Sequence, residues 1–261
     1  MTKSVAFLVQ NNHVLYNSIP VAQYALRNGI ELFDQSSTAE FDPMDCGVDW
    51  SEFDIVIPYG SVQFARLCRD RGLANHTFYS EEGFRTDLWI EKFGPRALNY
   101  AGTLMKAGEV FEHLGYAKEA HIRPNHVDKA FVASVFDQIS WDAVRQEQDI
   151  KDDLDVFVSP PMHIDAEFRC WIVGGKVIEM SSYRQNGEMF VERVVNLDGN
   201  IVRLAQDLAD VYLPNQAVVM DIAVCGSEVY FLEFNSIHSS GWYTADINRV
   251  FDCLIAYLGA V

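Results

Sequence analysis

Basic side chains are scarce in this sequence. Its 261 residues hold 20 lysines and arginines against 37 aspartates and glutamates, which gives a formal net charge of −17 at pH 7. A general binder of nucleic acid or of an anionic membrane surface needs a basic face. The charge therefore argues against both classes of partner.

Long hydrophobic runs and paired cysteines are also lacking. No stretch approaches the ~18 consecutive apolar residues of a membrane-spanning helix, and the segment MTKSVAFLVQNNH has no signal-peptide core or cleavage site. We therefore expect a cytoplasmic protein with no membrane partner. The five cysteines are scattered and form no CxxC pair, so neither a disulfide framework nor a zinc site is expected; they are Cys46, Cys68, Cys170, Cys225 and Cys253.

The composition that remains is that of a folded globular protein, with 49% hydrophobic and 22% charged residues. The length suits one large domain or two ordinary ones. Two patterns divide the chain near residue 95. Over 1–95, short apolar runs alternate with helical patterns, which indicates a parallel α/β sheet. The predicted strands are 5–9, 30–33 and 54–58, and the predicted helices are 20–28 and 62–71.

Over 96–261 the pattern changes to hairpins followed by helices, which indicates an α+β region with mainly antiparallel sheet. Two hairpins are predicted, at 167–184 and 218–235, with turns at Gly174-Gly175 and near Gly226-Ser227. The other predicted strands are 121–124, 129–136 and 156–159, and the predicted helices are 100–114, 141–148, 201–213 and 246–258.

The last hairpin carries the most informative side chains. Glu233 and Asn235 stand two residues apart and so project from one face of a strand, in a stretch that is otherwise apolar. A carboxylate buried there needs a partner or a metal ion. With Asp221 on the neighbouring strand, the donors are all oxygen, which suits magnesium or manganese. A solvated strand face with ordinary charges is the alternative.

The register of this hairpin decides whether the three side chains can meet. A two-residue turn at Gly226-Ser227 alone would pair Asp221 with Leu232 and turn it away from Glu233. A shared site therefore requires an odd loop or a β-bulge, and we expect one.

Cations follow in two other places. A two-residue turn at Gly174-Gly175 would place Arg169 and Arg184 on one face, where two guanidiniums could bind phosphate or carboxylate. An ion-pair ladder of Glu167 with Arg184 is the alternative. Arg123 and Lys129 bracket the loop PNHVD and could lie over a polyphosphate, or could simply belong to a solvated hairpin.

Three segments together resemble the ATP-grasp ligases: IRP…DKAF at 122–131, AEFRCWIVGGKVI…YR at 166–184, and MDIA…YFLEFNSIHSSGWY at 220–243. The EFNSIHSSG form looks closest to an uncharacterised ATP-grasp group of bacteria and their phages. The resemblance implies an ATP-grasp fold, in which two α+β subdomains hold nucleotide between them. It also implies a small α/β pre-ATP-grasp domain over 1–95.

The resemblance also implies ATP and magnesium as cofactors and assigns residues to them. Asp221, Glu233 and Asn235 fall on the family's metal ligands. Arg123 falls on the strand lysine that touches phosphate, and Lys129 falls on the cation of the covering loop. The adenine-reading hinge falls near Val156, Phe157, Val158 and Ser159. Three features depart from the family pattern: arginine at 123, a covering loop without a glycine-rich run, and the segment 236–241 in place of a Pro-Gly turn.

The implied reaction joins a carboxylate to an amine or thiol through an acylphosphate, with ADP and phosphate as products. Arg169 and Arg184 would hold the phosphoryl group or the substrate carboxylate. His238 would be a base, or else a hydrogen-bonding residue of its loop. The substrate would be a small molecule, an amino acid or a peptide, and ligases of this kind often form homodimers. The alternatives are an inactive ATP-binding regulator and a small-molecule kinase on the same fold.

Overall fold

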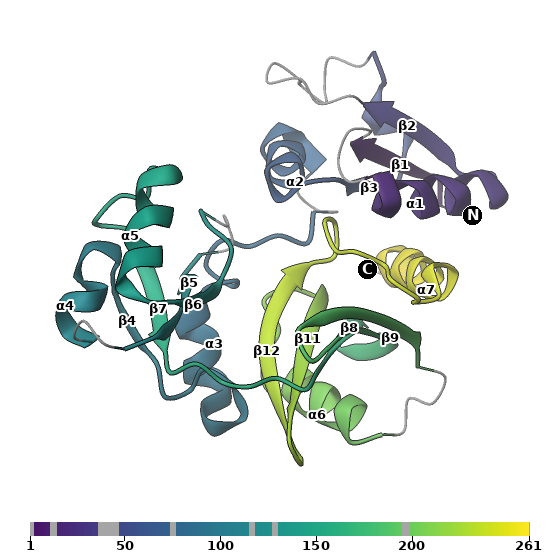
Figure 1. Ribbon diagram of the computed structural model, residues 1–261. Coiled ribbons are helices and arrows are strands. Elements are labelled where there is room, and N and C mark those ends of the chain that lie inside the picture. Colours follow the sequence, from purple (N-terminus) through teal and green to yellow (C-terminus); the bar gives the residue numbers. More distant parts are fainter. Residues whose placement is uncertain are drawn as a thin grey trace.

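Three β-sheets organise the chain in the computed structural model (Figure 1). The structure describes residues 3–10, 15–35, 47–73, 77–114, 118–126, 130–194 and 199–260. None of the helices in these ranges is long and apolar enough to cross a membrane.

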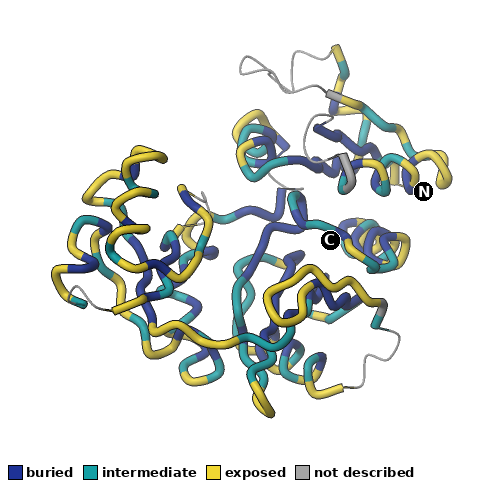
Figure 2. The backbone as a smooth tube through the Cα atoms, in the orientation of Figure 1, coloured by how far each residue is buried: buried dark blue, intermediate teal, exposed yellow. Residues whose placement is uncertain are grey.

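The N-terminal sheet is parallel, as the alternation of strands and helices predicts. Its order is β2-β1-β3, with β1 (Val5–Gln10) between β2 (Glu31–Gln35) and β3 (Ile55–Tyr59). Helices α1 (Leu15–Arg27) and α2 (Val62–Cys68) connect to these strands. Phe7 and Leu8 are both fully buried although they face opposite ways, because helices or loops cover both faces of a parallel sheet. The strand tube is accordingly dark blue in Figure 2.

The four-stranded sheet follows, with the order β4-β7-β5-β6 and antiparallel pairing throughout. Its strands are β4 (Thr103–Lys106), β7 (Asp155–Ser159), β5 (Ala120–Pro124) and β6 (Ser134–Phe136), and its helices are α4 (Val110–Leu114) and α5 (Gln138–Glu147). A small core surrounds Trp141, whose ring packs against Phe131 and Phe136.

The prediction of a helix over 100–114 is wrong in its first half. Thr103–Lys106 is a strand that pairs with β7, and helix α4 begins only at Val110. The close approach to β7 depends on Gly102, where a Cβ atom would stand 2.4 Å from Phe157 Cε1 and 2.7 Å from Val158 O. Strand pairing therefore outweighs the helical pattern of these residues.

The five-stranded sheet is antiparallel, with the order β10-β9-β8-β11-β12. Its strands are β8 (Ala166–Val173), β9 (Lys176–Gln185), β10 (Glu188–Arg193), β11 (Ala217–Cys225) and β12 (Glu228–Ser236). Side-chain alternation divides its two faces. Cys170 and Ile172 share one core with helices α3 (Thr86–Phe93) and α6 (Asn200–Ala209). Trp171 and Val173 share another core with α7 (Ile247–Ala260) and the N-terminal sheet.

Helix α7 therefore lies between the N-terminal sheet and the five-stranded sheet (Figure 1). Phe251 packs on Phe7 of β1 at 4.9 Å between ring centroids and on Trp242 at 5.2 Å. Helix α3, although it precedes residue 95, packs with the five-stranded sheet. The division of the chain into 1–95 and 96–261 stays a prediction.

Candidate active site

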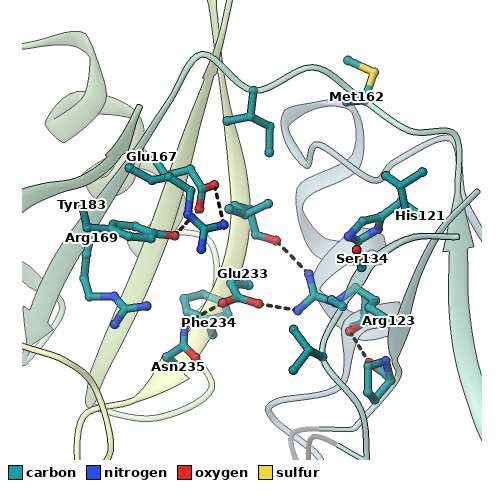
Figure 3. A pocket seen from close by; sticks show the side chains of 18 of the residues that line it. His121, Arg123, Ser134, Met162, Glu167, Arg169, Tyr183, Glu233, Phe234 and Asn235 are labelled. Atoms are coloured by element: carbon teal, nitrogen blue, oxygen red, sulfur yellow. Dashed lines mark hydrogen bonds and ion pairs between the residues drawn. The ribbon is translucent and has the colours of Figure 1, made fainter. Parts of the chain in front are cut away.

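A cavity of about 660 Å³ lies between the four-stranded and five-stranded sheets (Figure 3). One wall comes from β5 and the segment 131–135, and the opposite wall comes from β8, β9 and β12. The linker between β7 and β8 lines it with Met162, His163 and Ile164. This volume is in the range of small-ligand sites.

The bulge expected in the last hairpin is present. The turn at Gly226-Ser227 has two residues, but the register shifts between Asp221 and Ile222, which leaves Leu232 without a cross-strand partner. Asp221 consequently stands directly opposite Glu233. The bulge thus returns the two carboxylates to one face of the sheet.

Asp221 is fully buried and is held by Arg169, its cross-strand neighbour on β8. Arg169 donates from Nε to Oδ1 at 2.9 Å and from Nη2 to Oδ2 at 2.7 Å, which is a bidentate pair. Burial raises the pKa of Asp221, and the charge and hydrogen bonds of Arg169 oppose that rise. Burial would lower the pKa of Arg169, but Asp221 outweighs it and the net shift is upward.

Glu233 and Asn235 complete the cluster and line the cavity. Asn235 Nδ2 donates to Asp221 Oδ2 at 3.0 Å and to Glu233 Oε1 at 2.9 Å. Arg123 reaches across the cavity and donates from Nη2 to Glu233 Oε2 at 2.8 Å (Figure 3). The amide of Asn235 therefore bridges two carboxylates, and the side chains expected to share a site do converge.

The donor set fits a hard divalent cation. Among the described residues, no group of three or more His, Cys, Asp or Glu side chains is placed to hold a metal, so an amide must complete the set. Rotation of the Asn235 amide by half a turn would aim its oxygen, in place of Nδ2, at the carboxylates. Asp221 does not line the cavity and both of its oxygens accept hydrogen bonds from Arg169 or Asn235.

Arg123 is only 7% exposed and lies on the β5 wall. Its Nη1 donates to the carbonyl oxygen of the bulge residue Leu232 at 3.2 Å, and its guanidinium lies 5.3 Å from the ring centroid of Trp89. Its Nε has no hydrogen-bond partner among the described residues. Lys129, the other cation expected at this wall, lies outside the described residues.

Arg169 and Arg184 lie on the same face of the hairpin and both line the cavity. Two bulges rather than none set the register, and together they preserve the face that a plain two-residue turn predicts. Arg184 is half exposed, and its Nη1 stands 3.5 Å from Glu167 Oε1. The ion pair and the shared face, weighed as alternatives from the sequence, therefore occur together.

Aromatic rings that the sequence reasoning did not assign to the cavity surround Arg169. Its guanidinium lies 5.1 Å from the ring centroid of Tyr183 and 5.3 Å from that of Tyr243, and these two rings stack at 5.0 Å. The hydroxyl of Tyr183 donates to Glu167. Tyr183 is the unpaired residue of a bulge and Tyr243 has a φ of +50°. Neither irregularity has a clear sequence signal.

The expected adenine hinge is misplaced. Val156, Phe157, Val158 and Ser159 form β7, and none of the four lines the cavity. Strand β7 is central, so its backbone groups pair with β4 and β5 and are not free to read a base. The linker that follows lines the cavity instead, and Pro160-Pro161 is the signal that marks where the strand ends.

His238 does not fit the role of a base. It is 1% exposed and does not line the cavity. Its Nδ1 donates to Pro58 O at 2.5 Å, and its Nε2 accepts from the backbone N–H of Phe78 at 2.8 Å. His238 therefore ties the loop after β12 to the end of β3, which is the hydrogen-bonding alternative considered from the sequence.

Stability should depend on pH through His238. Burial lowers its pKa from 6.5 to about 4, so as the pH falls the unfolded chain takes up this proton first. Stability is thus lost as the pH falls from about 6.5 toward 4, and the histidine accounts for about 2 kcal/mol at pH 5. Urea unfolding at pH 7 and pH 5 should show a loss about 2 kcal/mol larger in wild type than in His238→Gln. Equal losses in the two proteins would contradict this assignment.

Comparison with known proteins identifies a family for this chain. The family whose profile matches is described as an ATP-grasp domain, the second family of its clade, and the match covers residues 105–253. Comparison with curated proteins gave no match. The likeness of EFNSIHSSG to a bacterial and phage group stays a prediction.

Several solved structures share the fold at low sequence identity. D-alanine–D-alanine ligase from Bacillus anthracis aligns with a TM-score of 0.67 at 10% identity, over 98% of both chains. D-cycloserine synthetase DcsG aligns at 0.64 and 12%, over 97% of this chain and 99% of its own. The ATP-grasp ligase PsnB, complexed with a minimal precursor, aligns at 0.61 and 15%, over 98% and 99%. The family match spans more than half of the sequence and the fold agrees with it, so this chain belongs to that family of ATP-grasp domains.

Proposed function

We propose that the protein is an ATP-dependent ligase that joins a carboxylate to an amine or a thiol. The observation that carries this proposal is the convergence of Asp221, Glu233 and Asn235, with Arg123 and Arg169, on one cavity between two sheets. Family membership supports ATP use, and structures of similar fold are titled as ligases, one of them complexed with ATP and another with magnesium and ADP.

The phosphates of ATP would lie between Arg123 and the cluster of Glu233 and Asn235. Arg123 has a free Nε among the described residues and already spans the cavity to Glu233. Lys129 would add a second cation from its loop. A protein with a net charge of −17 needs such local cations to hold a polyanion.

Glu233 and Asn235 would hold magnesium from the cavity wall, with Asp221 completing the set from beneath. The ion, when bound, supplies charge neutralisation for the phosphates. Arg169 keeps Asp221 ionised and oriented. Alignment and charge stabilisation, rather than a protein nucleophile, would account for the rate of such a phosphoryl transfer.

Arg184 is the cavity arginine with the weakest ion pair and would hold the substrate carboxylate, beside Arg169. The carboxylate oxygen attacks the γ-phosphorus, ADP leaves with the bridging electrons, and an acylphosphate forms. An amine then attacks the acyl carbon, phosphate leaves, and the amine loses a proton. Amino acids and peptides are the proposed substrates, as in the ligases of similar fold, and a homodimer is compatible with the proposal.

An ADP-release screen tests this function. Amino acids and short peptides are supplied with ATP and magnesium, once with a second amine and once with hydroxylamine. We expect at least one carboxylate to give ADP and, with hydroxylamine, a hydroxamate in equal amount, because hydroxylamine intercepts acylphosphates. A stable phosphorylated product without hydroxamate would indicate a kinase. ATP binding without ADP release by any compound would favour the inactive regulator.

A further inference from the structure

His121 is a cavity residue that neither the reaction nor the metal site uses. It lies on β5, half-buried, two residues before Arg123, and it lines the cavity (Figure 3). Its Nδ1 is buried without a hydrogen-bond partner among the described residues, and no group in those ranges is bonded to its Nε2. A histidine whose ring is left unsatisfied by the protein on a cavity wall is suited to a ligand.

Its position is at the end of the cavity away from the phosphates. On β7, Ser159 stands opposite His121 and Phe157 stands opposite Arg123. His121 is thus displaced from Arg123 by two strand residues, roughly 7 Å, toward the linker that carries Met162 and Ile164. Apolar side chains line this part of the cavity; they are Phe131, Val132, Val135, Met162 and Ile164.

The imidazole of His121 is neutral near pH 7. Burial and the nearby charge of Arg123 lower its pKa to about 4. A neutral ring carries one N–H. A buried acceptor without a partner costs less than a buried donor without one, so the covered Nδ1 is the unprotonated nitrogen and Nε2 carries the hydrogen.

We propose that His121 donates a hydrogen bond from Nε2 to the purine base of ATP, which makes it a residue that selects the nucleoside end of the ligand. The inference rests on the proposed function, because it requires that the cavity bind ATP. A neutral donor between apolar walls suits a flat base better than a phosphate, which the arginine two residues on is placed to bind.

Binding measurements separate the base from the rest of the nucleotide. Isothermal titration calorimetry with magnesium is carried out with ATP, 2′-deoxy-ATP and inorganic tripolyphosphate. His121→Phe keeps the ring shape without the N–H and should raise the Kd of ATP and of 2′-deoxy-ATP roughly five- to tenfold. The Kd of tripolyphosphate should stay within about twofold, since it lacks a base. His163→Phe is the matched control, because His163 also lines the cavity but is 79% exposed at its side chain and pairs with Asp165.

Each other outcome overturns the inference. An equal loss for tripolyphosphate would place His121 at the phosphates, and a loss for ATP but not for 2′-deoxy-ATP would place it at the ribose. Unchanged binding of all three would make it structural. His121→Gln, which retains an N–H donor, should bind ATP within about threefold of wild type. If His121→Phe does not fold, the ¹⁵N shifts of the wild-type ring decide, since they should change with ATP and not with tripolyphosphate. Failure of wild type itself to bind ATP would instead reject the proposed function, and this inference with it.

Discussion

Glu233→Gln should lower the rate of ADP release ~100- to 1000-fold while leaving the fold intact. The substitution removes one negative charge from the cluster and changes the side-chain volume little. Glu233 lines the cavity and contacts both Asn235 and Arg123, so its charge acts on whatever cation and phosphates bind there. Loss of one preorganised electrostatic contact to a reacting centre typically has an effect of this size.

The measurement is steady-state ADP release with the best carboxylate from the screen, together with thermal unfolding of each variant. Glu228→Gln is the control, because Glu228 begins the same strand but is exposed and lies away from the cavity. We expect the control to match wild type in both assays. Normal turnover by Glu233→Gln would show that Glu233 has no role with metal or phosphate.

Arg169→Met should cost about 3–5 kcal/mol of folding free energy. The substitution keeps a long apolar stem but leaves Asp221, which is fully buried, without its bidentate partner. A buried ion that loses its partner is far more costly than a pair replaced as a whole. The double variant Arg169→Met/Asp221→Asn should therefore be more stable than Arg169→Met alone.

Urea unfolding at pH 7 of wild type, both single variants and the double variant measures this coupling. Arg184→Met serves as the control, because Arg184 lies on the same face but is half exposed, and it should lose less than ~1 kcal/mol. A loss below ~1 kcal/mol for Arg169→Met, or additive losses in the double variant, would mean that the pair does not hold Asp221 in place.

The last hairpin shows how far the sequence could define the site. Alternation alone placed Glu233 and Asn235 on one face, and the chemistry of their surroundings required Asp221 to join them. That requirement predicted an irregularity, which the structure shows at Leu232. The position of the bulge depends on packing and on the hydrogen bond from Arg123 to the Leu232 carbonyl, which come from a distant part of the chain.

Other elements depend on contacts that a local pattern does not contain. The segment 103–106 reads as helix but pairs with β7, and the hinge residues 156–159 read correctly as a strand but not as a central one. Strand β10 did carry a signal that the analysis of the sequence missed. Asn186-Gly187 is a typical two-residue hairpin turn, and both residues have a positive φ, of 48° and 80°.

A crystal structure of the protein with a non-hydrolysable ATP analogue and magnesium tests the central claim most directly. We predict phosphates between Arg123 and the five-stranded sheet, with a metal ion about 2.0–2.1 Å from oxygens of Glu233 and Asn235. The base should lie near His121 and the linker 162–164. Nucleotide bound elsewhere, or a cavity that stays empty with Glu233 still paired to Arg123, would contradict the account.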